Sequence, residues 1–285
     1  MCLGFRRDDN SSVGRRTVIF ALPLYDDNPV HRPPVVTCTL IGLCIGAFLW
    51  QLGQNPQVVA LEYGMIPAVL FGYRELPPDL AILSPWATIF TSMFLHAGVL
   101  HLGGNMLFLW IFGNNIEDLL GGARYLLLYL ASGIAAALVQ ALAATHSQIP
   151  MIGASGAIAG VLGAYLVTYP RANVHCFVWI VIFFWVVTVP AWILLGLWFA
   201  MQLSSGLVVG PAAPGVAFWA HVGGFGTGII LFLLLRPHRV RLLQPQRSPV
   251  RATAPPSTLV GRHTFHHGSV PDAGRRYPRP PGPWG

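Results

Sequence analysis

A polar side chain within a long apolar segment is costly and therefore needs a reason, and four such side chains stand out in this chain. They are His101, Asn105, Ser155 and His221. Ser155 follows Gly153 at the expected start of a helix, where free backbone N–H groups and the helix dipole stabilise negative charge. A serine there could act as a nucleophile, with a histidine as general base and its own N–H as oxyanion donor. These residue types point to acyl transfer.

The spacing of glycines offers a way to bring the serine and the histidine together. Gly224 and Gly228 follow His221 at i+3 and i+7, so the histidine shares a helix face with a stripe of small residues. A matching stripe begins at Gly156, directly after Ser155. Helices with such stripes approach each other closely in membranes. We expect the two stripes to pack and to place the imidazole within hydrogen-bond reach of the hydroxyl.

Each of these residues also has an interpretation that involves no catalysis. His101 and Asn105 are one helical turn apart, and such a pair often serves only as hydrogen-bonding glue between membrane helices. The serine could be an ordinary N-cap, and the second histidine a packing or proton-relay residue. The acidic pair Glu117 and Asp118 lies at the opposite end of its segment. The catalytic hypothesis is therefore a Ser-His dyad and not a Ser-His-Asp triad.

The composition indicates a membrane protein. Of the 285 residues, 54% are hydrophobic and only 9% are charged, against about 25% charged in soluble proteins. The net charge of +7 comes mainly from arginines in the two polar end segments, where positive charge orients a membrane protein. We expect the lipid bilayer as a partner and no nucleic acid. The sequence has no His-Glu-x-x-His pattern, and we predict neither a metal nor a cofactor.

Hydropathy predicts six membrane-spanning helices. They cover residues 35–53, 101–120, 125–144, 155–168, 177–201 and 216–235. The fourth is short, and the fifth contains Pro190, which should kink it. Arginines concentrate on the side of the two ends of the chain, which predicts cytoplasmic termini. The starts of the second, fourth and sixth spans then share the opposite side, together with the four polar residues.

The predicted fold class is therefore all-α, a polytopic membrane protein with a six-transmembrane-helix bundle over residues 35–235. Residues 1–34 are expected to form a cytoplasmic N-terminal tail. Residues 236–285 are rich in Pro and Arg and are expected to form a disordered cytoplasmic C-terminal tail. Residues 54–100 contain several prolines and charges, and we expect them to lie partly in the membrane interface.

Four motifs, in this order, resemble the rhomboid family of intramembrane serine proteases. They are His101-x-x-x-Asn105, Gly113-x-x-x-Glu117-x-x-x-Gly121, Gly153-Ala154-Ser155-Gly156 and Ala220-His221-x-x-Gly224-x-x-x-Gly228. The resemblance covers about residues 35–235. It implies that Ser155 is the nucleophile, that His221 is the general base, and that His101 and Asn105 stabilise the oxyanion. It also implies that the Glu117 motif is structural.

The resemblance implies a function and a location. The function is that of a serine endopeptidase that cleaves transmembrane segments of single-span or multi-span membrane proteins. A six-span core without a seventh helix resembles the bacterial members, which implies a multi-pass protein of a bacterial inner membrane. By the same resemblance, the fifth span is a lateral gate and residues 203–215 form a mobile cap.

Two points stay open at the level of sequence. Family members often carry Tyr or Phe four residues after the serine, where the histidine packs, but this chain has Ala159. The alternative functions are a catalytically inactive rhomboid-like protein that binds membrane clients, and a small transporter that uses the polar residues as a pathway. Client-binding relatives usually lack the serine or the histidine, and transporters usually show repeats or intramembrane charges. The protease is therefore the preferred hypothesis.

Overall fold

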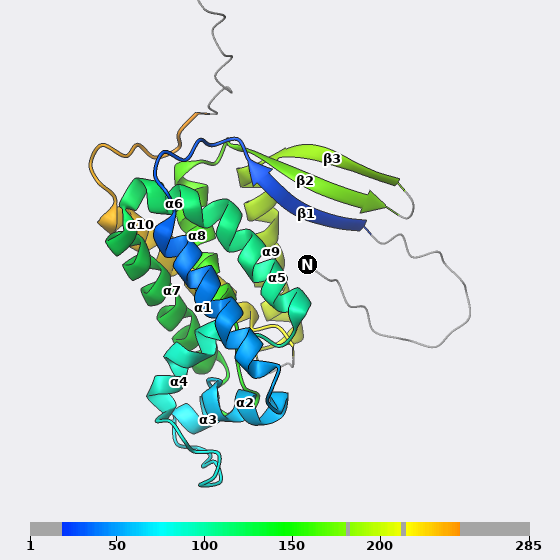
Figure 1. Ribbon diagram of the computed structural model, residues 1–285, viewed down its shortest axis with the longest axis vertical. Coiled ribbons are helices and arrows are strands. Elements are labelled where there is room, and N and C mark those ends of the chain that lie inside the picture. Colours follow the sequence, from blue (N-terminus) through cyan, green and yellow to red (C-terminus); the bar gives the residue numbers. More distant parts are fainter. Residues whose placement is uncertain (1–18, 181–182, 212–214, 246–285) are drawn as a thin grey trace, which may run out of the picture. The chain divides into compact units, whose positions relative to one another are not determined.

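The computed structural model describes residues 19–180, 183–211 and 215–245. Within these ranges the chain forms a bundle of apolar helices with a small antiparallel sheet at one end (Figure 1). Most of the expected C-terminal tail, residues 246–285, lies outside the described residues, as do residues 1–18 of the expected N-terminal tail.

The helices of the bundle follow the predicted spans closely except for the fifth. They are α1 (Val35–Gln51), α5 (Val99–Phe108), α6 (Asn114–Leu120), α7 (Gly122–Ala143), α8 (Ser155–Thr168), α9 (Ala191–Val209) and α10 (Phe218–Leu235). A π-helical turn, Leu109–Gly113, joins α5 to α6.

Within the part of the chain that the structure describes, fewer than six helices are long and apolar enough to count as membrane spans. Among the described residues α7, α9 and α10 are each long and apolar enough to cross a membrane. A fourth candidate is the helix Val99–Leu120 together with Pro85–Phe94, which meet at a bend of 80°. The helices α1 and α8 are apolar but shorter. The fold is thus a mostly helical membrane bundle.

Prolines start the short helices that connect α1 to α5. These helices are α2 (Pro56–Tyr63), α3 (Pro67–Leu70) and α4 (Pro85–Thr91), followed by the 3-10 turn Ser92–Phe94. Proline suits the first helical position because its missing N–H would have no partner there and its φ is already helical. In α2 and α4 the preceding residues, Asn55 and Ser84, accept hydrogen bonds from the first turn with their side chains. The segment is therefore helical and compact.

The prediction of an all-α fold was wrong in one region. Three antiparallel strands pair in the order β1 (Ile19–Asp26), β2 (Asn173–Ile180) and β3 (Phe183–Pro190). The predicted fifth span, 177–201, is divided between this sheet and α9. Residues 173–190 are rich in β-branched and aromatic side chains, which favour strands. Pro190 is the last residue of β3 and also precedes the first residue of α9, so the strand gives way to the helix at the proline.

Asp26 ties the sheet to the helices. Its Oδ2 accepts a short hydrogen bond from the Tyr165 hydroxyl of α8, and a 3.0 Å hydrogen bond from Asn115 Nδ2 of α6. Asn28 Nδ2 donates to the same oxygen at 3.1 Å. The end of β1 is thus fixed to two helices that come much later in the chain.

Stability should depend on pH through this carboxyl group. Burial raises the pKa of Asp26 from its ordinary value of 3.8, and the hydrogen bonds from Tyr165, Asn28 and Asn115 oppose that rise. The contribution of a carboxyl with a raised folded-state pKa is fully present below its unfolded pKa and declines as the pH rises through the folded pKa. Asp26→Asn is therefore expected to lessen the fall in thermal stability over the range of pH that begins near about 4, where an ordinary aspartate ionises, and continues upward.

Thermal unfolding in detergent, followed by intrinsic fluorescence across that range, measures this effect. Asp79→Asn is the matched control, because Asp79 lies exposed in the segment between α3 and α4. It should keep the native pH profile. An Asp26→Asn protein with the same pH slope as the native protein would contradict the assignment.

Glu117 joins α6 to the start of α1. Its carboxylate accepts hydrogen bonds from the backbone N–H groups of Val36 and Thr37, each at 2.8 Å, and from the Thr37 hydroxyl at 2.8 Å. A carboxylate is favoured at a helix N-terminus, where unpaired N–H groups and the helix dipole meet it. These contacts fit the structural part expected for the Glu117 motif.

Candidate active site

The helices α8 and α10 pack with their backbones in contact. A Cβ added to Gly228 would lie 2.0 Å from the carbonyl oxygen of Gly160. A Cβ added to Gly224 would lie 2.0 Å from the carbonyl oxygen of Gly156. No side chain fits at either distance, so only glycine allows this approach. The predicted packing of the two small-residue stripes is confirmed.

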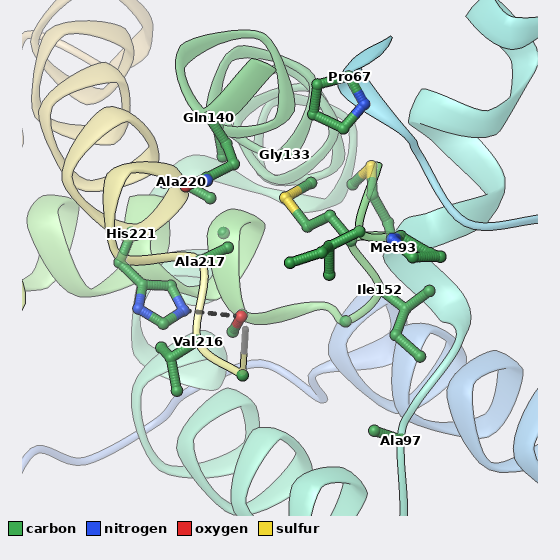
Figure 2. Close-up of a pocket in the computed structure, with 18 of the residues that line it drawn as sticks. Pro67, Met93, Ala97, Gly133, Gln140, Ile152, Val216, Ala217, Ala220 and His221 are labelled. Atoms are coloured by element: carbon green, nitrogen blue, oxygen red, sulfur yellow. Dashed lines mark hydrogen bonds between the residues drawn. The ribbon is translucent and has the colours of Figure 1, made fainter. Parts of the chain in front are cut away.

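This packing brings Ser155 and His221 together. Ser155 is the first residue of α8, and His221 lies in the first turn of α10. His221 Nε2 is 2.8 Å from Ser155 Oγ, and Figure 2 shows the ring pointing at this hydroxyl. The imidazole is 8% exposed. At this distance an unprotonated Nε2 can accept the hydroxyl proton, which is the geometry needed for a general base.

Two residues of α9 hold the other side of the imidazole. His221 Nδ1 is 2.7 Å from Gln202 Oε1, and the Trp198 ring centroid is 5.6 Å from that of His221. Trp198 thus supplies the aromatic contact that Ala159 cannot. The sequence pattern did not single out either residue. Gln202 lies beyond the predicted end of the fifth span at residue 201, and the helical register of Trp198 within that span was not defined. The available signal was a glutamine, one turn after a tryptophan, within an otherwise apolar segment.

His101 borders the same space as the serine. Its Nδ1 accepts a 3.3 Å hydrogen bond from the Ala97 N–H, which leaves Nε2 as a donor in the neutral ring. A Cβ added to Gly153 would lie 2.9 Å from His101 Nε2 and 3.7 Å from Ser155 Oγ. Gly153 also has a φ of +130°, which favours glycine. Gly153, two residues before the serine, therefore leaves room for the His101 ring.

Asn105 lies one turn further along α5 and is not among the residues lining the cavity beside Ser155. Its side chain is 8% exposed. Within the described residues its amide nitrogen, Nδ2, has no hydrogen-bond partner. A buried donor without a partner is unusual and calls for an explanation. Of the four predicted residues, three line the cavity and Asn105 does not.

The serine and the two histidines open onto a cavity of about 480 Å³. This volume lies within the ordinary range for ligand sites, about 300–1,000 Å³. Small and apolar side chains form much of the remaining wall. Among them are Met93, Ala97, Ile152, Val216 and Ala217, which Figure 2 shows in the same cavity as His221. The cavity therefore suits an apolar segment better than a charged ligand.

Fold and cavity together define a helical membrane protein with a serine–histidine pair at the starts of two packed helices. Residues 84–238, more than half of the chain, match the family model described as the Rhomboid domain. The chain therefore belongs to the rhomboid family.

Three relatives illustrate the similarity. The chain is 41% identical over 98 residues to Rhomboid protease GluP of Bacillus subtilis (strain 168), over 34% of this chain and 18% of that protein. It is 39% identical over 148 residues to RHOMBOID-like protein 4 of Arabidopsis thaliana, covering 51% and 33%. It is 35% identical over 210 residues to the yeast protein named Rhomboid protein 1, mitochondrial (Saccharomyces cerevisiae), covering 70% and 53%. The chain spans about half or less of the length of these relatives.

The predicted placement in a bacterial inner membrane is corrected by these similarities. The yeast relative is named as mitochondrial, as are relatives from Arabidopsis thaliana and Danio rerio. A placement in a bacterial inner membrane therefore does not follow from the similarities. The prediction was wrong because it rested on the number of spans, and a span count carries no direct information about which membrane a protein occupies.

Proposed function

We propose that this protein is an intramembrane serine endopeptidase that cleaves transmembrane segments of other membrane proteins. The observation that carries the proposal is the 2.8 Å contact between Ser155 Oγ and His221 Nε2 at the wall of an apolar cavity. The relative named Rhomboid protease GluP supports the same class of reaction. In this proposal Ser155 is the nucleophile and His221 the general base.

The first half of the reaction forms an acyl-enzyme. The Ser155 oxygen attacks the carbonyl carbon of the scissile peptide bond, and its proton passes to His221 Nε2. The oxygen of the tetrahedral intermediate accepts hydrogen bonds from the Ser155 N–H and from His101 Nε2. Asn105 Nδ2, which has no partner among the described residues, would donate to it as well once its side chain turned toward the cavity. Such a donor contributes about 3 kcal/mol. The C–N bond then breaks, and His221 gives its proton to the leaving amine.

The second half releases the acyl group. A water molecule attacks the ester carbon while His221 Nε2 takes one of its protons. The ester C–O bond breaks, and the proton returns to the Ser155 oxygen. Water is the only co-reactant, so the proposed reaction balances without a cofactor.

We further propose that six helices cross the membrane, namely α1, the α5–α6 pair, α7, α8, α9 and α10. In this arrangement the short length of α8 determines how deep Ser155 lies in the membrane. Its 14 residues extend about 21 Å, which is less than the hydrocarbon thickness of about 30 Å. Ser155, the first residue of α8, would therefore lie below the membrane surface, where the cavity connects it to water. Bonds within the membrane would be cleaved at this depth.

A peptide bond inside a helix is shielded by its own hydrogen bonds, so substrates should contain helix-weakening residues near the cut. The expected substrates are single-span or multi-span membrane proteins. The protein reconstituted in liposomes with a single-span substrate should cleave it. A fluorophosphonate probe, which loses fluoride as a serine oxygen attacks phosphorus, should modify Ser155, as located by mass spectrometry. The control Ser204→Ala changes an exposed serine of α9 and should retain both results.

Three outcomes would contradict the proposal. Modification of a serine other than Ser155 would show that another residue is the nucleophile. A folded protein that binds membrane clients but neither cleaves nor reacts would favour the client-binding function. Solute flux without proteolysis would favour a transporter.

A further inference from the structure

An amide side chain meets the imidazole from the side opposite the serine. Gln202 lies on α9, an apolar helix, and its side chain is 5% exposed. A buried polar group in such a helix is costly unless it makes hydrogen bonds. The Gln202 amide makes a contact of 2.7 Å, from Oε1 to His221 Nδ1. The placement of this glutamine is therefore accounted for by the histidine.

The chemistry of the amide decides which nitrogen of the ring carries the proton. A carbonyl oxygen can only accept a hydrogen bond, so an Oε1 contact at 2.7 Å requires a proton on Nδ1. In a neutral ring Nε2 is then unprotonated and faces the Ser155 hydroxyl as an acceptor. The opposite tautomer would put a proton on Nε2, and the ring could no longer take one from the serine.

We propose that Gln202 is a positioning residue that fixes the tautomer and orientation of His221. This inference rests on the proposed function and adds a third member to the dyad. A carboxylate often orients a catalytic histidine. An amide oxygen offers the same acceptor without burying a second charge, which a membrane helix would tolerate poorly. Trp198 closes one side of the ring and limits its rotation.

Two substitutions separate this assignment from a merely structural one. Gln202→Leu keeps most of the volume but removes the acceptor, and is expected to lower kcat about tenfold or more with little change in KM. Gln202→Glu restores an acceptor and adds a negative charge that favours the protonated ring. It should therefore recover part of the rate at high pH and move the acidic limb of the pH–rate profile to higher pH. Ser204→Leu, on an exposed position of the same helix, is the control and should leave rate and profile unchanged.

A readout independent of cleavage keeps the two proposals distinguishable. Nitrogen NMR of 15N-histidine-labelled protein reports which ring nitrogen carries the proton, with the His221 signals assigned by comparison with His221→Asn. The native protein should show the Nδ1–H tautomer, and Gln202→Leu should show a mixture or the Nε2–H form. Native-like tautomer, rate and pH profile in Gln202→Leu would overturn the inference while leaving the protease proposal intact. An inactive native protein that still shows the Nδ1–H tautomer, lost in Gln202→Leu, would overturn only the protease proposal.

Discussion

Replacing Ser155 with alanine is expected to lower cleavage of a transmembrane substrate by at least about 10⁴-fold, with the fold retained. The substitution removes one oxygen atom, the atom that would form the acyl-enzyme. The same loss is expected for His221→Ala, because the serine hydroxyl then has no base to take its proton. Residues that act as a unit give non-additive losses. The double variant should therefore be no slower than the slower single variant.

Initial rates in liposomes and thermal unfolding of each variant measure these expectations. The free energy of unfolding should change by no more than about 1 kcal/mol for Ser155→Ala, since a single hydrogen bond is lost. A double variant a hundredfold slower than either single variant would show that the two side chains act independently. Substantial cleavage by Ser155→Ala would show that Ser155 is not the nucleophile.

Adding a single methyl group at Gly228 is expected to abolish most of the proposed activity without changing Ser155 or His221. The new Cβ would lie 2.0 Å from the Gly160 carbonyl oxygen, and backbone atoms cannot move aside as a flexible side chain can. The helices α8 and α10 must separate, which should destabilise the fold by about 1–3 kcal/mol. Because the Ser155–His221 contact is 2.8 Å, even a shift of about 1 Å should lower cleavage roughly 100-fold.

Gly226 supplies a control on the same helix. A Cβ added there meets nothing within 4 Å among the described residues. Gly226→Ala should therefore keep the native rate and be neutral or slightly stabilising, because alanine favours helices over glycine. Comparing the two alanine variants by cleavage and thermal unfolding separates close backbone packing from a general effect of adding a methyl group. Equal behaviour of the two variants would contradict the packing argument.

Local patterns in the sequence predicted most of the bundle and the meeting of Ser155 with His221. The α8 boundaries agree with the prediction because Gly153 closes the preceding loop and an uncharged, mostly apolar segment follows it. The contact between Ser155 and His221 was predictable because matching stripes of small residues fix which helix faces meet. Asn105 was expected beside the serine from its spacing, yet it does not line the cavity. A spacing of one helical turn shows that His101 and Asn105 share a helix face. It does not show which of the two side chains reaches the cavity beside Ser155.

The parts that escaped prediction depend on long-range pairing or on helix register. A continuous apolar run such as residues 177–190 suits a buried strand as well as a helix, and periodicity alone does not separate them. One partner of β2 is β1, whose residues lie about 150 positions earlier in the sequence. No local pattern in the sequence predicts such a pairing. Gln202 could be related to His221 only once α9 was known to begin at Ala191.

The pairing of β1 with β2 also constrains how the chain is threaded through its membrane. β1 precedes α1, whereas β2 follows α8, and the two strands are hydrogen-bonded to each other. Hydrogen-bonded strands lie on one side of the bilayer, so the chain must cross an even number of times between them. Four crossings, by α1, the α5–α6 pair, α7 and α8, satisfy this parity, and three do not. The strand pairing therefore constrains the number of membrane crossings between β1 and β2, which the lengths of the helices alone do not determine.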